Sequence, residues 1–129
     1  MIQLPIIWIT STIGVWLFYV QHNFDPGYWD HHEGWEFVKA GLQGSSFYKL
    51  PLILQWFSGN IGFHHIHHLS PKIPNYFLPE CHATHPAFQI EPLTLLESLK
   101  CTTLHLYDEA TKELVGFDAL KRYRRQAAG

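Results

Sequence analysis

An uncharged N-terminal segment most constrains the fold of this chain. The run MIQLPIIWITSTIGVWLFYV contains no Asp, Glu, Lys or Arg, and the first formal charge is Asp25. About 20 residues at a rise of about 1.5 Å would span a hydrocarbon core of about 30 Å. We therefore predict one transmembrane helix over residues 2–20, with Trp16, Phe18 and Tyr19 at the interface. The segment lacks the basic start and cleavage site of a signal peptide. A buried helix of a soluble protein is the alternative.

The composition supports a membrane-associated chain. With 129 residues the chain is long enough for one small domain, and its net charge of −2 gives no reason to expect nucleic-acid binding. Only 16% of the residues are charged, against roughly a quarter in average globular proteins. We expect a mainly α fold: a membrane-embedded helical fragment with one transmembrane helix, interfacial helices and a small cytoplasmic C-terminal region.

The rest of the chain predicts short elements. Gly and Pro separate the periodic segments, and the uncharged run after Lys49 is too short to span a membrane easily. We expect an amphipathic interfacial helix at 34–42, an interfacial or bundle-buried helix after Lys49, a loop at 77–90, a helix at 92–100, a hairpin within 102–117 and a mobile basic tail at 121–129.

Four histidines lie within five positions in GNIGFHHIHHLSPKIPNY, residues 59–76. On a helix, His64, His67 and His68 fall within an arc of about 100°, so three imidazoles can face one point. Imidazole binds Zn, Cu, Fe and Ni. His65 lies at the edge of the arc, and the prolines at 71 and 74 end the helix. The pattern therefore predicts a metal site; a surface cluster of histidines is the alternative.

The same stretch resembles the third histidine box, H-x-x-H-H, of the membrane fatty acid desaturases. NIGFHHIHHLSPKIPNY is similar to the acyl-lipid type that introduces a double bond at Δ12 or a neighbouring position. WLFYVQHNFDPGYWD resembles the end of the preceding transmembrane helix in that family, and GSSFYKLPLILQWFSGNIG resembles its approach to the box. The resemblance continues through IPNYFLPECH and, weakly, TLLESLK and LVGF.

The resemblance implies a chemistry and a set of ligands. His64, His67 and His68 would bind iron, His22 would be an additional ligand, and His65 would support the ligands without binding metal. The implied cofactor is a di-iron centre, with O₂ as co-substrate. The implied partners are the lipid bilayer, an acyl-lipid substrate and an electron donor such as ferredoxin or cytochrome b5. The histidine box and the C-terminus would lie on the cytoplasmic face.

One departure from the family pattern limits this expectation. Complete desaturases carry two earlier histidine boxes, whereas residues 1–60 contain only His22, His31 and His32. We therefore expect residues 1–129 to be the C-terminal part of a desaturase domain, with its helix at 2–20, its box at 64–68 and its cytoplasmic tail at 77–129. We do not expect activity from this part alone.

Three other readings stay open. The chain could be a small membrane-anchored protein that binds one Zn or other divalent ion through the three box histidines, with His22 as the fourth ligand. It could be a non-catalytic fragment whose histidines are relics. It could also come from a related acyl hydroxylase or carotenoid oxygenase, because the same kind of centre can hydroxylate or desaturate.

The remaining reactive side chains match no motif. We expect His31 and His32 to be solvated loop residues, and the histidines at 82, 85 and 105 to lie at the surface. Cys81 and Cys101 form no CxxC pair and are interpreted as reduced packing residues. The basic KRYRR run at 121–125 is interpreted as a positive-inside tail beside anionic headgroups, or as a docking site for an acidic electron donor.

Overall fold

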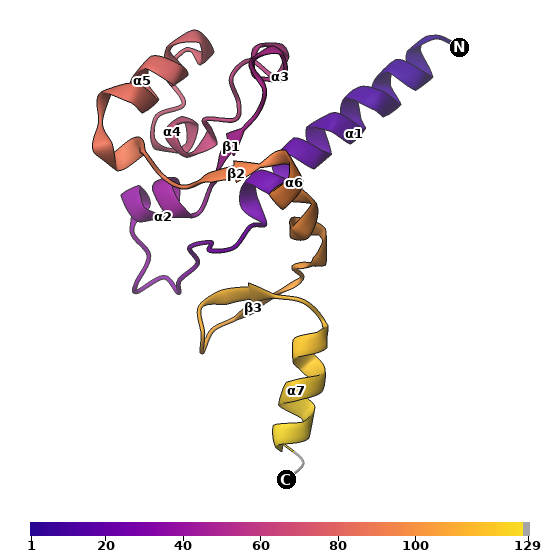
Figure 1. Ribbon diagram of the computed structural model, residues 1–129, viewed down its shortest axis with the longest axis vertical. Coiled ribbons are helices and arrows are strands. Elements are labelled where there is room, and N and C mark those ends of the chain that lie inside the picture. Colours follow the sequence, from indigo (N-terminus) through magenta and orange to yellow (C-terminus); the bar gives the residue numbers. More distant parts are fainter. Residues whose placement is uncertain (128–129) are drawn as a thin grey trace.

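The computed structural model describes residues 1–127 and is mainly helical, as the sequence predicts. Helix α1 projects from the body of the molecule, and α7 extends from the other end (Figure 1). Two parallel strands and one hairpin accompany the helices. The α-helices are α1 (Gln3–His22), α2 (Phe37–Gln43), α3 (Leu52–Phe57), α4 (His64–Leu69), α5 (Leu78–Thr84), α6 (Leu95–Ser98) and α7 (Asp118–Ala127). The 3₁₀ helices are η1 (Asn75–Phe77), η2 (Pro86–Phe88) and η3 (Leu99–Thr103), and the strands are β1 (Phe47–Lys49), β2 (Pro92–Thr94), β3 (Leu106–Asp108) and β4 (Glu113–Val115).

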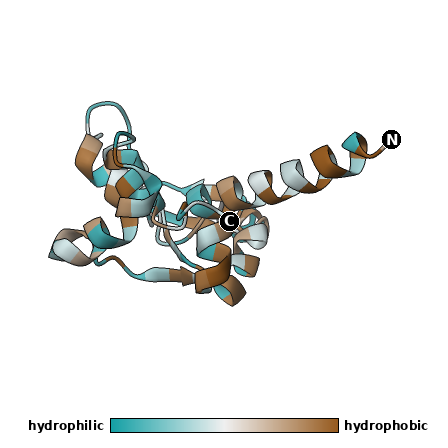
Figure 2. Ribbon diagram, turned by 90° about the horizontal axis from the view of Figure 1, so that it is seen from above, coloured by the Kyte–Doolittle hydropathy of each residue, from teal (hydrophilic) through white to brown (hydrophobic). Residues whose placement is uncertain are grey.

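Helix α1 is long and apolar enough to cross a membrane, and hydrophobic residues recur along its length as it projects from the body (Figure 2). Its apolar side chains are almost all exposed. The hydroxyl groups of Thr10 and Thr12 donate hydrogen bonds to backbone carbonyls one turn earlier, at 2.8 Å each. This pairing satisfies polar groups that would otherwise face an apolar surrounding. The helix runs two residues beyond the predicted end, so that His22 is its last residue rather than part of the following loop.

Two small apolar clusters hold the body together. One joins the last turns of α1 to β1 and η3 through Val20, Tyr48 and Cys101. The other joins α4 to α5 through Ile66 and Leu78 and also includes Phe63. Strand β1, which pairs in parallel with β2, connects the two clusters, because Tyr48 belongs to the first cluster and its neighbour Phe47 packs against the second. The residues at the end of α1 are thereby fixed relative to α4.

The segment 77–90 is not a loop, and that prediction is wrong. Leu78 is buried against α4, and Pro79 occupies the first turn of α5, where its missing N–H costs nothing. Proline therefore starts the helix here rather than interrupting it. The predicted helix at 92–100 is half right, because β2 takes residues 92–94 before α6 begins. Thr94 and Glu97 form a reciprocal capping box at that start.

The C-terminal region confirms one prediction and differs from another. The hairpin is present, as β3 and β4 with an antiparallel register. The basic tail predicted at 121–129 forms a helix, α7, as far as residue 127, and residues 128–129 lie outside the described part of the chain. Asp118 in its first turn and Arg124 and Arg125 in its last turn match the helix dipole. The Tyr123 hydroxyl also donates a hydrogen bond to the Asp108 carboxylate of the hairpin.

The interfacial helix predicted at 34–42 begins later, as α2 at Phe37, because residues 32–34 form a turn. Gly41 of α2 faces α4, where an added Cβ would lie 2.7 Å from the Leu69 side chain. This absence of a side chain lets α2 lie directly against the helix that carries the histidine box. The segment after Lys49 forms only the six-residue α3, whose apolar side chains are mostly exposed.

Gly62 lies at a close backbone approach just before the histidine box. A Cβ there would lie 2.3 Å from the Tyr48 carbonyl oxygen, which is backbone and cannot move aside cheaply. We expect Gly62→Ala to lower the unfolding free energy of the detergent-solubilised chain by about 1–3 kcal/mol. Gly14→Ala is the control: nothing lies within 4 Å of its Cβ position, so the thermal midpoint should stay or rise slightly. Equal midpoints for the two variants would contradict the packing described here.

Candidate metal centre

Three imidazole nitrogens converge between the end of α1 and helix α4. The Nε2 atom of His22 lies 3.0 Å from Nε2 of His68 and 3.3 Å from Nε2 of His64. The Nε2 atoms of His64 and His68 are 3.1 Å apart. His64 and His68 are one helical turn apart, so both rings leave the same face of α4. Together the three nitrogens form a group that could hold a metal ion.

The hydrogen bonding of His22 fixes the direction of its lone pair. Its Nδ1 lies 2.8 Å from the carbonyl oxygen of Phe18, which can only accept, so Nδ1 carries the proton. Nε2 of a neutral ring then carries a lone pair directed at the other two histidines. This orientation of one nitrogen toward a carbonyl and the other toward the shared point is the arrangement that metal-binding histidines adopt.

The spacing of the nitrogens also suits a metal ion. Metal–nitrogen bonds of about 2.1 Å place two ligands about 3.0 Å apart at right angles and about 3.4 Å apart at the tetrahedral angle. The observed separations of 3.0, 3.1 and 3.3 Å fall between these limits. The donor set and its geometry therefore fit a divalent ion bound on one side by three imidazoles.

Burial keeps the imidazole ring of His64 neutral, the form that binds metal ions. His64 is only 8% exposed, and burial, with the neighbouring His68 and His22, lowers its pKa to about 3. Burial likewise lowers the pKa of His68, although that side chain is exposed on its outer side. Both rings are therefore neutral at neutral pH, the state from which imidazole binds metal. The exposure of His68 leaves one side of the group open.

Buried polar contacts next to His22 position it. Gln21 is 1% exposed, and its side-chain Nε2 donates to the carbonyl of Ile61 at 2.7 Å, in the turn before α4. The backbone carbonyl of Gln21 accepts a hydrogen bond from the backbone N–H of Ser46 at 3.0 Å. On the other side, the Asn23 amide donates to the Cys101 carbonyl at 2.9 Å. Gln21 thus ties the element that carries His22 to the one that carries His64. Its only sequence signal is a polar residue at the end of an apolar helix.

His67, the remaining histidine of the H-x-x-H-H box, lies outside this group. The ring of His67 stacks beside that of His64, with centroids 5.6 Å apart and an interplanar angle of 21°, but its nitrogens do not join the three that converge. The sequence expectation that one helical arc would bring all three box rings to a single point therefore holds for two of them. His22, from another helix, takes the third place.

Buried His65 and half-buried His82 form a second pair. His65 is completely buried, with Nε2 3.0 Å from the carbonyl of Phe88 and 3.4 Å from Nδ1 of His82. Burial lowers the pKa of His65 to about 4. The His82 ring packs against Phe47 and Phe63 and is half-buried, so the prediction that it lies at the surface holds only in part. Helix α5, in a segment predicted to be a loop, brings His82 to these rings.

The other reactive side chains behave as expected. The histidines at 31, 32, 85 and 105 are exposed, and His31 contacts Glu109 at 3.2 Å. Both cysteines are free thiols, with Cys101 buried in the cluster beside α1. None of these residues joins the histidine group within residues 1–127.

The chain combines one helix long and apolar enough to cross a membrane with a group of three histidines that could hold a metal ion. The family model described as fatty acid desaturase matches residues 1–95. A Bacillus subtilis (strain 168) protein named fatty acid desaturase is 51% identical over 122 residues, which are 94% of this chain and 35% of that protein. The chain therefore belongs to the fatty acid desaturase family, and it spans about a third of the length of this relative. No solved structure matches it.

The geometry predicts which histidines bind a single ion. We expect the detergent-solubilised chain to bind one Co²⁺, followed by its visible absorption. His22→Ala, His64→Ala and His68→Ala should each weaken binding by more than the ~10–100-fold that loss of an outer partner costs. His67→Ala should leave the affinity unchanged, with exposed His31→Ala as the control. A His67 variant as weak as the His64 variant would contradict this assignment.

The pKa shifts predict acid sensitivity of the metal-free chain. The pKa values of His64 and His65 fall to about 3 and 4 on folding, from about 6.5 in the unfolded chain. Between these values the unfolded state binds more protons, so stability falls as the pH drops. The loss for each group approaches ~1.4 kcal/mol per pH unit. We expect the thermal midpoint to fall between pH 7 and pH 5, and His65→Gln to reduce the slope of that fall. An unchanged midpoint would show that neither ring is buried neutral.

Proposed function

We propose that this chain supplies part of the iron site of an O₂-dependent acyl-chain desaturase. The convergence of three imidazole nitrogens, in a chain that belongs to the fatty acid desaturase family, is the observation that carries the proposal. When bound, the iron pair supplies the oxidising chemistry: O₂, two electrons and two protons take two hydrogens from adjacent CH₂ groups, leaving a double bond and two waters.

The residues of this chain have distinct roles in the proposal. His22, His64 and His68 hold one metal ion, and the hydrogen bond from His22 Nδ1 to the Phe18 carbonyl keeps its Nε2 free to bind. His67, whose ring lies beside that of His64, binds the second iron. A two-iron centre needs more ligands than these four, so we propose that the others belong to sequence outside this chain and that the chain is inactive alone.

The finer assignment concerns the substrate and the membrane. We propose an acyl-lipid substrate and a double bond at Δ12 or a neighbouring position, supported by the resemblance of the segment after the box, SPKIPNY. Helix α1 would cross the bilayer. The box and the C-terminal region, residues 77–129, would then lie on the cytoplasmic face, where the last turn of α1 meets α4.

The basic residues of α7 support a proposed role in electron delivery. Lys121, Arg122, Arg124 and Arg125 are all exposed, and α7 lies at the end of the molecule opposite the start of α1 (Figure 1). This placement favours an acidic soluble donor, such as ferredoxin or cytochrome b5, over anionic headgroups at the end of α1. Charge complementarity of this kind increases association rates and is weakened by salt.

A single divalent ion is the second candidate function. The three converging nitrogens suffice for one ion, and the exposed side of His68 could admit a water as fourth ligand. The Zn reading from the sequence included His67 as well, but that ring lies outside the group. Metal analysis of the chain purified from cells separates the candidates, since tightly held Zn at one per chain favours this second function.

A domain replacement tests the proposed activity. We would replace the region of the Bacillus protein that matches this chain with the corresponding 122 residues of this chain, and express the hybrid in a host without an O₂-dependent desaturase. We expect new unsaturated fatty acids by gas chromatography and mass spectrometry, and none from this chain alone. Because each ligand acts on the same centre, His64→Ala or His67→Ala in the hybrid should lower the product at least about 100-fold.

His31→Ala is the matched control and should leave the hybrid active, since this histidine is exposed and outside the metal group. The unaltered Bacillus protein controls for expression and electron supply. If the hybrid is inactive while the unaltered Bacillus protein is active at an equal protein level, the proposed desaturase function is contradicted. Hydroxylated fatty acids in place of unsaturated ones would instead support the alternative function of an acyl hydroxylase.

A further inference from the structure

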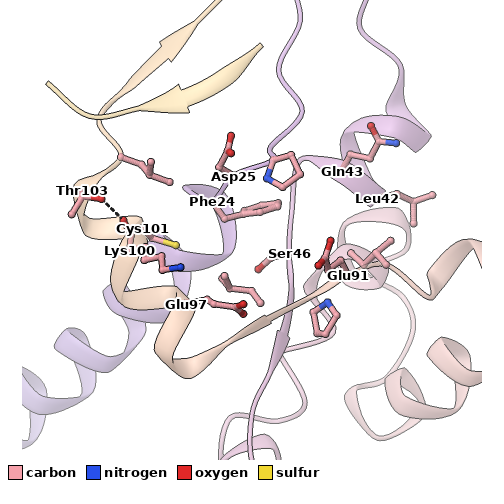
Figure 3. A pocket seen from close by; sticks show the side chains of 15 residues that line it. Phe24, Asp25, Leu42, Gln43, Ser46, Glu91, Glu97, Lys100, Cys101 and Thr103 are labelled. Atoms are coloured by element: carbon pink, nitrogen blue, oxygen red, sulfur yellow. Dashed lines mark hydrogen bonds between the residues drawn. The ribbon is translucent and has the colours of Figure 1, made fainter. Parts of the chain in front are cut away.

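A cleft of about 610 Å³ opens just beyond the C-terminal end of α1. Its walls come from the residues after α1, the end of α2, the segment before β2, and the α6–η3 region (Figure 3). The volume lies within the range of about 300–1,000 Å³ that is usual for small-molecule sites. None of the histidines of the candidate metal centre lines it, so the cleft is a separate feature of the chain.

Ser46 gives the cleft an unsatisfied polar group. The residue is only 2% exposed, and its hydroxyl oxygen is buried without a hydrogen-bond partner in the described part of the chain. Its backbone N–H donates to the carbonyl of Gln21 at 3.0 Å, which fixes the residue in place. A buried hydroxyl without a partner is unfavourable, and Ser46 lines the cleft. A bound polar group would supply the missing hydrogen bond.

The charges around the cleft limit what can bind. Three carboxylates and one ammonium line it: Asp25, Glu91, Glu97 and Lys100. Asp25 already accepts a hydrogen bond from the backbone N–H of Leu114, and Glu97 caps α6. Within residues 1–127, the side chains of Glu91 and Lys100 have no ion-pair or hydrogen-bonding partner, although the backbone carbonyl of Lys100 accepts a hydrogen bond from the Thr103 hydroxyl. The excess of carboxylates disfavours a nucleotide or other polyanion.

A metal ion does not explain the carboxylates. In the described part of the chain, only His22, His64 and His68 gather their ligand atoms closely enough for one ion. The oxygens of the cleft are therefore too dispersed for a cation site. Their arrangement instead suits a larger ligand with separated positive and negative groups, because Lys100 projects from the α6–η3 side and Glu91 from the segment before β2, with Ser46 between them in the view of Figure 3.

The position of the cleft suggests where that ligand comes from. If α1 crosses the bilayer, its last residue, His22, lies near the membrane surface, and the cleft begins two residues later at Phe24. Phe24, Leu42 and Leu93 give it apolar surface beside the charged groups. This is the level at which phospholipid headgroups meet protein. The step rests on the proposed membrane placement, and not on the metal centre.

We propose that this cleft binds the zwitterionic headgroup of a phospholipid. The ammonium of the headgroup pairs with the Glu91 carboxylate and donates to the Ser46 hydroxyl oxygen. The phosphate pairs with Lys100, and the glycerol region rests on the apolar walls. Phosphatidylethanolamine carries both charges and N–H donors, whereas phosphatidylglycerol presents only the phosphate to a net negative site. The cleft should therefore discriminate between these two lipids.

Lipid retention by the metal-free chain tests this site. Purified protein in detergent would be mixed with equal amounts of phosphatidylethanolamine and phosphatidylglycerol that carry identical acyl chains. After gel filtration, the lipid retained per chain would be measured by mass spectrometry. We expect one phosphatidylethanolamine per chain, in about tenfold excess over phosphatidylglycerol, as loss of one charged hydrogen bond implies.

Variants locate the binding. Glu91→Gln should remove the preference, Lys100→Met should lower retention of both lipids, and Ser46→Ala should lower retention of phosphatidylethanolamine about three- to tenfold. Glu80→Gln and Lys72→Met are matched controls, because both side chains are exposed and outside the cleft. Glu91 is itself exposed, so Glu91→Gln should fold normally, as checked by circular dichroism.

Two results would overturn the proposal. One is equal retention of the two lipids by the unaltered chain, or a preference that survives Glu91→Gln. The other is full competition by soluble phosphoethanolamine at the concentration where the lipid saturates, which would assign the cleft to a free zwitterion instead. Because the measurement needs neither metal nor turnover, failure of the proposed desaturase activity leaves it unaffected.

Discussion

The candidate metal centre depends on three imidazole nitrogens, Nε2 of His22, His64 and His68, that lie 3.0 to 3.3 Å from one another. His22 cannot donate to the other two rings when its Nδ1 proton is held by the Phe18 carbonyl. Burial makes protonation costly, since it lowers the pKa of His64 to about 3. A divalent cation can engage all three nitrogens at once, because each ring then donates the Nε2 lone pair to the ion. The group is thus better explained as a ligand set than as core packing.

The convergence requires two chain segments that are far apart in sequence to be held to within a few tenths of an ångström. Most of helix α1 is exposed, so packing along its length cannot position His22. The last turn of α1 positions it instead. Gln21 binds the turn before α4, and Asn23 binds the end of η3. The ligand His22 lies between these two anchors, so its position is set by buried hydrogen bonds on both sides rather than by the helix as a whole.

The sequence alone predicted the parts of this arrangement that are local. The charge-free run predicted α1, and the spacing of His64 and His68 predicted two ligands on one face of a helix. Local periodicity could not show that His67 would turn aside while His22 completed the group, because that depends on how α1 and α4 pack. The error at 77–90 has the same origin. Pro79 looks like a helix breaker in sequence, yet it starts α5 once Leu78 is buried against α4.

Gln21 also connects the metal centre to the cleft. Its side chain donates to Ile61 on the metal side, while its carbonyl accepts from the N–H of Ser46 at the cleft. A shift of Ser46 would therefore act on the residue next to His22 through one backbone hydrogen bond. The backbone of Ser46 is therefore held by the same residue that holds the turn before α4, so the cleft and the metal centre share one buried support.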